Sequence, residues 1–147
     1  MKAEELMIGD WVTITEHDDF HGYIAKVVII NGETDYITVH IPNMHLHDVF
    51  ADDLQPVQLT EEILEKNGWK KHIWWRYKQS DVITYDIVDD IVDEFYLEVT
   101  DDGFALVNDL SDDEDHGYMS NWIADINYVH ELQHALKLCK IEKEIIL

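Results

Sequence analysis

Two dipeptides constrain the fold of this chain more than any other feature. Asn31-Gly32 and Asp102-Gly103 each stand between two strand-like runs, which are residues 23–30, 35–41, 95–100 and 104–107. Asn, Asp and Gly tolerate the positive φ angles of tight turns, so both dipeptides predict β-hairpins. Antiparallel sheet is therefore expected in both halves of the chain.

Residues 1–58 carry strand signals and no helix signal. A Gly-Asp turn leads into Trp11–Thr15, and Pro42 ends the strand at 35–41 because proline has no N–H for a ladder. A last short strand is expected near Val49 or at 55–58. Several short strands joined by turns predict a small SH3-like β-barrel over residues 1–58.

Residues 59–147 combine strands with two helices, expected near 60–67 and 128–139. Thr60 is the expected N-cap of the first helix, and Asn67-Gly68 its left-handed C-cap. Asn127 or Asp125 is expected to cap the second helix. The predicted fold class is α+β, an SH3-like barrel followed by an antiparallel sheet with two helices.

Two acidic segments complete this half. Residues 86–94 fit either a helical stripe, with apolar pairs four apart, or a hairpin around Asp89-Asp90, and the β-branched chemistry favours the hairpin. Residues 109–117 are predicted to be an acidic surface loop.

The net charge excludes some partners. The chain has 32 acidic and 10 basic residues and a formal charge of −22. Residues 1–58 carry 11 acids and 2 bases, so the acidity is not confined to one tail. Nucleic acids and anionic membranes need basic surfaces. We therefore expect neither direct nucleic-acid nor membrane binding.

The lone Cys139 cannot form an intrachain disulfide and fits a buried helical position. The first residues lack the apolar stretch of a signal peptide, and no apolar run reaches the ~20 residues of a membrane span. The chain is therefore expected in the cytoplasm. The sequence contains no Walker loop, no G-x-G-x-x-G and no G-x-S-x-G motif, and no cofactor is predicted.

His130-Glu131-Leu132-Gln133-His134 matches the H-E-x-x-H pattern of zinc hydrolases. Two histidines four apart on a helix could bind zinc, with Glu131 as general base. A catalytic zinc needs a third protein ligand, and the 13 residues after His134 contain neither His nor Asp. His130, Glu131 and His134 are therefore predicted not to form a metal site.

Residues 69–79 are rich in aromatic and basic side chains. Trp, Tyr and Arg concentrate at protein interfaces when they are exposed, but alternate aromatics in a strand also fill cores. The candidate interface residues are Trp69, Trp74, Trp75, Arg76 and Tyr77.

Three segments resemble a family of small uncharacterised proteins from gut Bacteroidetes and their phages or mobile elements. They are ELMIGDWV, DLQPVQLTEEILEKNGW and INYVHELQHALKL, which lie near both ends and at the centre of the chain. The resemblance implies no activity. It implies a packing and capping role for Tyr128, Val129, His130, Leu132 and Gln133, since the family's usual residue at the position of His134 is Asn.

Three functions remain open at this point. A non-enzymatic protein-interaction module of phage or mobile-element origin, with an unknown protein partner, is the first. An acidic mimic of nucleic acid that inhibits a DNA- or RNA-binding protein is the alternative. A zinc hydrolase built on the H-E-x-x-H segment is the third.

Overall fold

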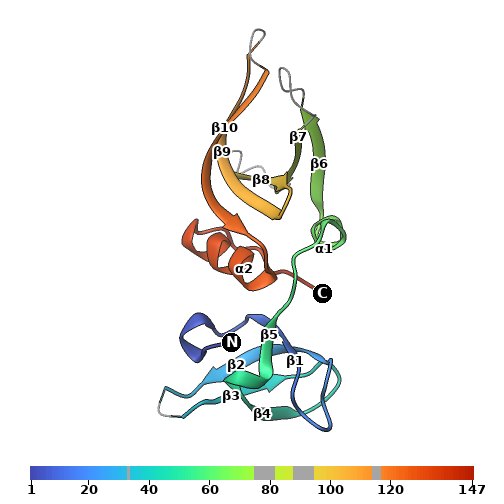
Figure 1. Cartoon of the computed structure of the whole chain (residues 1–147), viewed down its shortest axis with the longest axis vertical. Helices are drawn as coiled ribbons and strands as arrows, with labels where there is room; N and C mark the ends of the chain where they lie inside the picture. The colour runs from blue at the N-terminus through green and yellow to red at the C-terminus, as the bar shows by residue number, and fades with distance from the viewer. Residues whose placement is uncertain (33, 75–81, 88–94, 114–116) are drawn as a thin grey trace. The chain divides into compact units, whose positions relative to one another are not determined.

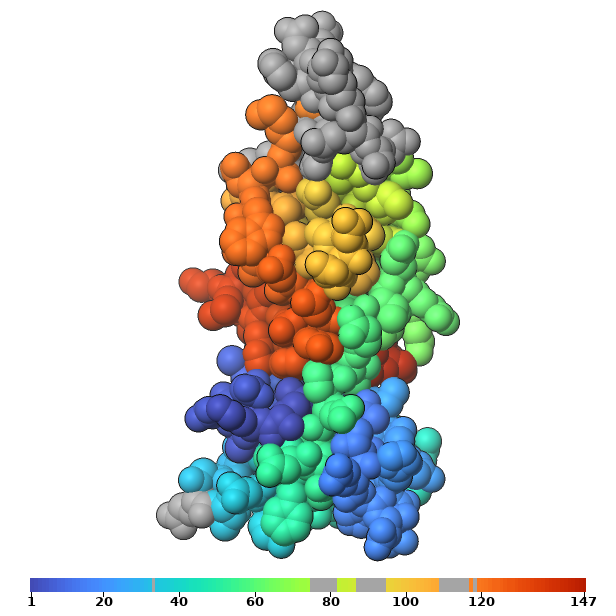
Figure 2. All heavy atoms as spheres, viewed as in Figure 1, coloured from blue at the N-terminus to red at the C-terminus, as the bar shows by residue number. Residues whose placement is uncertain are grey.

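The computed structural model describes residues 1–32, 34–74, 82–87, 95–113 and 117–147. The chain divides into two compact units, each built from two segments (Figure 1). The first unit is Met1–Gln58 with Tyr128–Glu142, and the second is Leu59–Asn127 with Lys143–Leu147. The helix near the C-terminus thus belongs to the first unit, whereas the sequence placed it with residues 59–147. Figure 2 shows all atoms, with the residues outside the described ranges in grey.

The first unit contains one five-stranded sheet of order β4-β3-β2-β1-β5, in which every pairing is antiparallel. The sheet does not close into a barrel, so the predicted closed barrel is not seen in the described residues. Its strands are β1 (Trp11–Ile14), β2 (Ile24–Ile30), β3 (Tyr36–His40), β4 (Leu46–Phe50) and β5 (Leu54–Pro56), with 3₁₀ turns η1 (Ala3–Glu5) and η2 (Ala51–Asp53).

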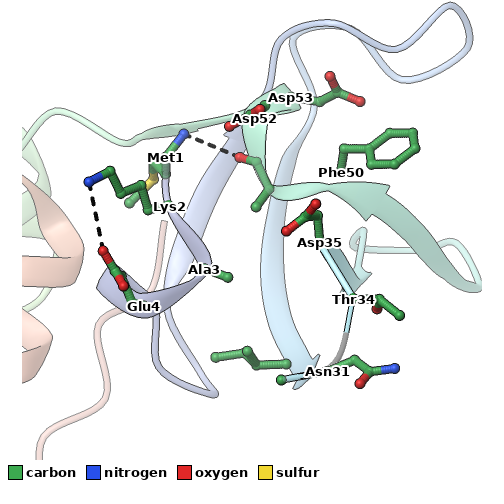
Figure 3. A pocket seen from close by; sticks show the side chains of 13 residues that line it. Met1, Lys2, Ala3, Glu4, Asn31, Thr34, Asp35, Phe50, Asp52 and Asp53 are labelled. Atoms are coloured by element: carbon green, nitrogen blue, oxygen red, sulfur yellow. Dashed lines mark hydrogen bonds and ion pairs between the residues drawn. The ribbon is translucent and has the colours of Figure 1, made fainter.

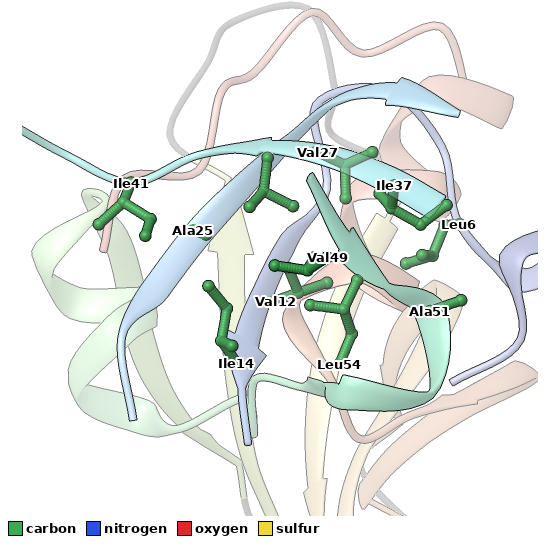
Figure 4. Close-up of a cluster of buried hydrophobic side chains, with 11 residues drawn as sticks. Leu6, Val12, Ile14, Ala25, Val27, Ile37, Ile41, Val49, Ala51 and Leu54 are labelled. Carbon is green, nitrogen blue, oxygen red and sulfur yellow. The ribbon is translucent and has the colours of Figure 1, made fainter. Parts of the chain in front are cut away.

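Alternate residues of these strands form the core of the first unit. Successive side chains of a strand point to opposite faces, so one face of each strand turns inward. Figure 4 shows the inward side chains meeting between the strands. The buried cluster is Leu6, Val12, Ile14, Ala25, Val27, Ile37, Val39, Ile41, Val49, Ala51 and Leu54.

The second unit contains a five-stranded antiparallel sheet of order β10-β9-β8-β7-β6. The Asp102-Gly103 turn joins β8 to β9 as predicted, with Thr100 opposite Gly103. The predicted acidic loop is wrong up to Asp113, because β9 continues through it and pairs with β10. The strands are β6 (Trp69–Trp74), β7 (Val82–Ile87), β8 (Phe95–Thr100), β9 (Gly103–Asp113) and β10 (Gly117–Ile126). The choice between helix and hairpin at 88–94 lies outside the described residues.

Helix α1 (Glu61–Lys66) has the predicted ends. The Thr60 hydroxyl accepts the Ile63 N–H at 3.3 Å, and Gly68 has a φ of +79°. The buried Tyr85 donates its hydroxyl to Glu61, whose carboxylate also binds Lys71 Nζ at 2.7 Å. The pKa of Glu61 is lowered mainly by the hydrogen bond from Lys71, and the hydrogen bond from Tyr85 is the second cause. These contacts hold α1 on the sheet.

Helix α2 spans Val129–Leu138, so it begins one residue after the expected start at residue 128. Tyr128 is the N-cap, and its N–H donates to the Glu131 carboxylate at 3.0 Å. Asn127 and Asp125 are therefore not the cap. Val129, Leu132 and Leu136 are buried on one face. Among the described residues, no helix has the length and apolar character needed to cross a membrane. With two antiparallel sheets and two helices, the fold is α+β.

Candidate functional site

The H-E-x-x-H segment lies on α2, and Glu131 and His134 each bind a group within the first unit. Glu131 caps its own helix through Tyr128. His134 Nε2 lies 2.8 Å from Oδ2 of Asp10, which is fully buried. Within the described residues, no group of three or more His, Cys, Asp or Glu side chains is arranged to hold a metal ion. This arrangement attaches a helix to a loop.

The Gln133 side chain adds two hydrogen bonds to this attachment. Its Nε2 donates to the Gly9 carbonyl at 2.9 Å, and its Oε1 accepts the Trp11 N–H at 3.2 Å. One turn later, Lys137 Nζ donates to the Ile8 carbonyl at 3.2 Å. We call this set of contacts the loop clamp. It joins two segments that stand more than 100 residues apart in the sequence.

His130 adjoins the loop clamp and is 8% exposed. Its Nδ1 is buried and has no hydrogen-bond partner within the described part of the chain, and the same holds for Oδ1 of Asp10. Burial lowers the pKa of His130. The nearby carboxylates of Asp10, Glu131 and Glu5 act in the opposite direction, and His134 acts with burial. His130 therefore favours its neutral form in the folded state.

Replacing His130 with phenylalanine is expected to weaken the acid sensitivity of the fold. With its folded-state pKa below the unfolded value, the folded protein binds fewer protons there. His130's contribution is therefore fully present above its ordinary pKa and is lost as the pH falls through it. Urea unfolding between about pH 8 and about pH 5 should show a smaller loss of stability in His130→Phe than in the native chain. His45→Phe, at an exposed position, is the control, and equal slopes for both variants would contradict the prediction.

Of the five candidate interface residues, Trp69 and Trp74 lie in the described part of the chain, and neither is fully exposed. Trp69 is 4% exposed and belongs to the core of the second unit. Trp74 is half-buried, and its Nε1 donates to Thr84 Oγ1 at 2.8 Å. Trp75, Arg76 and Tyr77 lie outside the described residues. Trp69 therefore fills the core, which is the alternative to an interface that the sequence also allowed.

Exposed apolar side chains gather instead on the outer face of β3 and β4 in the first unit. Cross-strand partners share one face of a sheet. Tyr36 faces Phe50, Thr38 faces Asp48, and His40 faces Leu46. These six residues define the β3–β4 face. The Tyr36 and Phe50 rings lie 4.3 Å apart, and Tyr36, Phe50 and Leu46 are 45%, 47% and 54% exposed.

An open pocket of about 820 Å³ adjoins this face at the end of β4 (Figure 3). Phe50 stands at its rim, and η1 forms its opposite wall. Asp35, Asp52 and Asp53 line the pocket, and their carboxylates have no hydrogen bond or ion pair with the described residues. The two cations on the opposite wall have partners of their own. Lys2 Nζ lies 3.7 Å from Glu4 Oε1, and the Met1 ammonium donates to the Ala51 and Leu54 carbonyls. The pocket therefore adds negative potential beside an apolar surface.

Sequence reasoning did not identify the β3–β4 face. Its signal was the alternation in residues 35–41, which predicts a strand with one solvated face. Tyr36 and Phe50 each look like ordinary strand residues, and only the register of β3 with β4 puts their rings together. Asp10 was also missed, because its partner His134 is distant in the sequence.

Comparisons with protein-family models, curated proteins and solved structures gave no match for the chain.

Proposed function

We propose that this chain is a non-enzymatic protein-interaction module that binds a partner protein through the β3–β4 face. The observation that carries the proposal is the half-exposed pair Tyr36 and Phe50, whose tilted rings are in contact, beside the exposed Leu46. Aromatic side chains that remain exposed supply a large contact area at small entropic cost and recur as binding hot spots. A solvated sheet face without a partner would favour polar residues at these positions.

The position of β4 supports the proposal. It is an edge strand, paired only with β3 among the described strands. Edge strands offer unpaired backbone groups to another chain, and many recognition domains use them. Strand β5 pairs with β1, so the strands of this sheet that come first and last along the chain are neighbours, as they are in a small SH3-like barrel. We therefore propose that the first unit is an open variant of the SH3-like barrel.

The polar cluster on α2 offers less support for catalysis. Hydrolysis at an H-E-x-x-H segment requires a free carboxylate as base and two histidines directed at one metal. Glu131 caps the helix and His134 binds Asp10. These contacts favour a structural role for the segment, and a binding function for the chain.

The proposal predicts that a photoreactive phenylalanine analogue at Phe50 captures a discrete partner in an extract of the encoding organism. The same analogue at Leu138, which is 80% exposed on α2 of the same unit, is the matched control. The paired change Tyr36→Ser and Leu46→Ser should then weaken binding of the purified partner at least about tenfold, because the apolar contact is lost. Equal capture at both positions, or none at Phe50, would refute the proposed function.

A further inference from the structure

We infer that the β3–β4 face binds an extended, basic segment of a partner protein, which adds to β4 as a further strand and alternates apolar, basic and apolar side chains. This inference rests on the proposed function and names the chemistry of its partner. Leu46, Asp48 and Phe50 are all exposed and lie on one face of the strand.

A strand added to β4 would place its own alternate side chains opposite these three residues. Apolar side chains fit opposite Leu46 and Phe50, where the rings of Tyr36 and Phe50 extend the contact. A cation fits opposite Asp48. The Thr38 hydroxyl donates to Asp48 Oδ1 at 2.6 Å, which fixes the carboxylate and leaves Oδ2 without a partner within the described residues. Lysine or arginine could bind that oxygen.

The negative charge around the β3–β4 face favours a basic partner. Asp35, Asp52 and Asp53 continue the negative potential past the end of β4. Lys26 on β2 shares this side of the sheet, opposite His40, and its Nζ lies 5.4 Å from the centre of the Trp11 ring. Opposite charges across neighbouring strands stabilise their pairing, whereas like charges destabilise it.

A second copy of this chain is a poorer occupant of the face. Antiparallel pairing of β4 with its own copy would bring two Asp48 carboxylates near each other. It would also join two chains that each carry a charge of −22. Both effects oppose association. Sedimentation of the purified protein should therefore show no dimer that depends on Phe50.

The test uses a capped heptapeptide of sequence TVTRTFT, which presents valine, arginine and phenylalanine on one face, and its glutamate counterpart TVTETFT. Each is titrated into the isotopically labelled full chain at about 0.15 M salt, where long-range attraction is screened. We expect the arginine peptide to shift the amide resonances of residues 46–50. We expect it to bind about tenfold more tightly than the glutamate peptide.

Charge reversal provides the matched control. Asp48→Lys should abolish or reverse the preference for the arginine peptide. Asp18→Lys, which changes the net charge equally at an exposed loop position, should preserve it. Equal effects of the two variants, shifts away from β4, or no binding of either peptide would overturn the inference. Capture at Phe50 of a partner that lacks a basic extended segment would also overturn it while leaving the proposed function intact.

Discussion

Replacing Gln133 with leucine is expected to lower the free energy of unfolding of the first unit by about 2–6 kcal/mol. The side chain is 8% exposed and binds two backbone groups, the Gly9 carbonyl and the Trp11 N–H. Leucine preserves most of the volume but can bind neither group. Each buried group left unpaired costs about 1–3 kcal/mol, so the two losses together exceed the effect of most substitutions.

Hydrogen exchange of the β1 amides measures this loss in the first unit, and urea unfolding measures it for the whole chain. The control is Leu138→Ala, on the same helix but 80% exposed, which should change stability by less than about 0.5 kcal/mol. If Gln133→Leu is no more destabilising than the control, the loop clamp contributes little and α2 is held by its apolar face alone.

The loop clamp also shows where sequence reasoning stops. The H-E-x-x-H spacing correctly indicates that His130 and His134 share a helix, but it gives no information about the opposing surface. Asp10 and Gln133 stand 123 positions apart, and their roles depend on the packing of α2 against residues 7–11. A helical spacing is local, whereas the partner of a buried side chain is set by tertiary structure. The pairing of Tyr36 with Phe50 was not predicted for the same reason, because it depends on the register of β3 with β4.

Predictions from short sequence signals were correct where the interactions behind them involve only neighbouring residues. The Asp102-Gly103 turn and the Thr60 cap depend on the backbone preferences and short side chains of a few neighbouring residues, and both were confirmed. The acidic segment 109–117 shows the limit of this approach. Its charge suggested a loop, yet residues 109–113 extend β9, because pairing with β10 satisfies the backbone regardless of side-chain polarity.

Replacing Gly103 with alanine is expected to destabilise the second unit by about 2–5 kcal/mol, from two separate causes. Gly103 has a φ of +150°, which strains any residue with a Cβ atom by about 1–3 kcal/mol. The added Cβ would also lie 2.2 Å from Asn127 Oδ1, and the displaced side chain adds about 1–3 kcal/mol of overpacking.

Two other glycines separate these causes. Gly68 has a φ of +79° with open space around its Cβ position, so Gly68→Ala should show the backbone strain alone. Gly32 has open space and no positive φ, so Gly32→Ala should stay within about 0.5 kcal/mol of the native chain. Adding Asn127→Ala to Gly103→Ala should recover the overpacking part and none of the backbone strain. Thermal and urea unfolding of the four variants measure these differences. A Gly103→Ala cost no greater than that of Gly68→Ala would show that Asn127 moves aside freely.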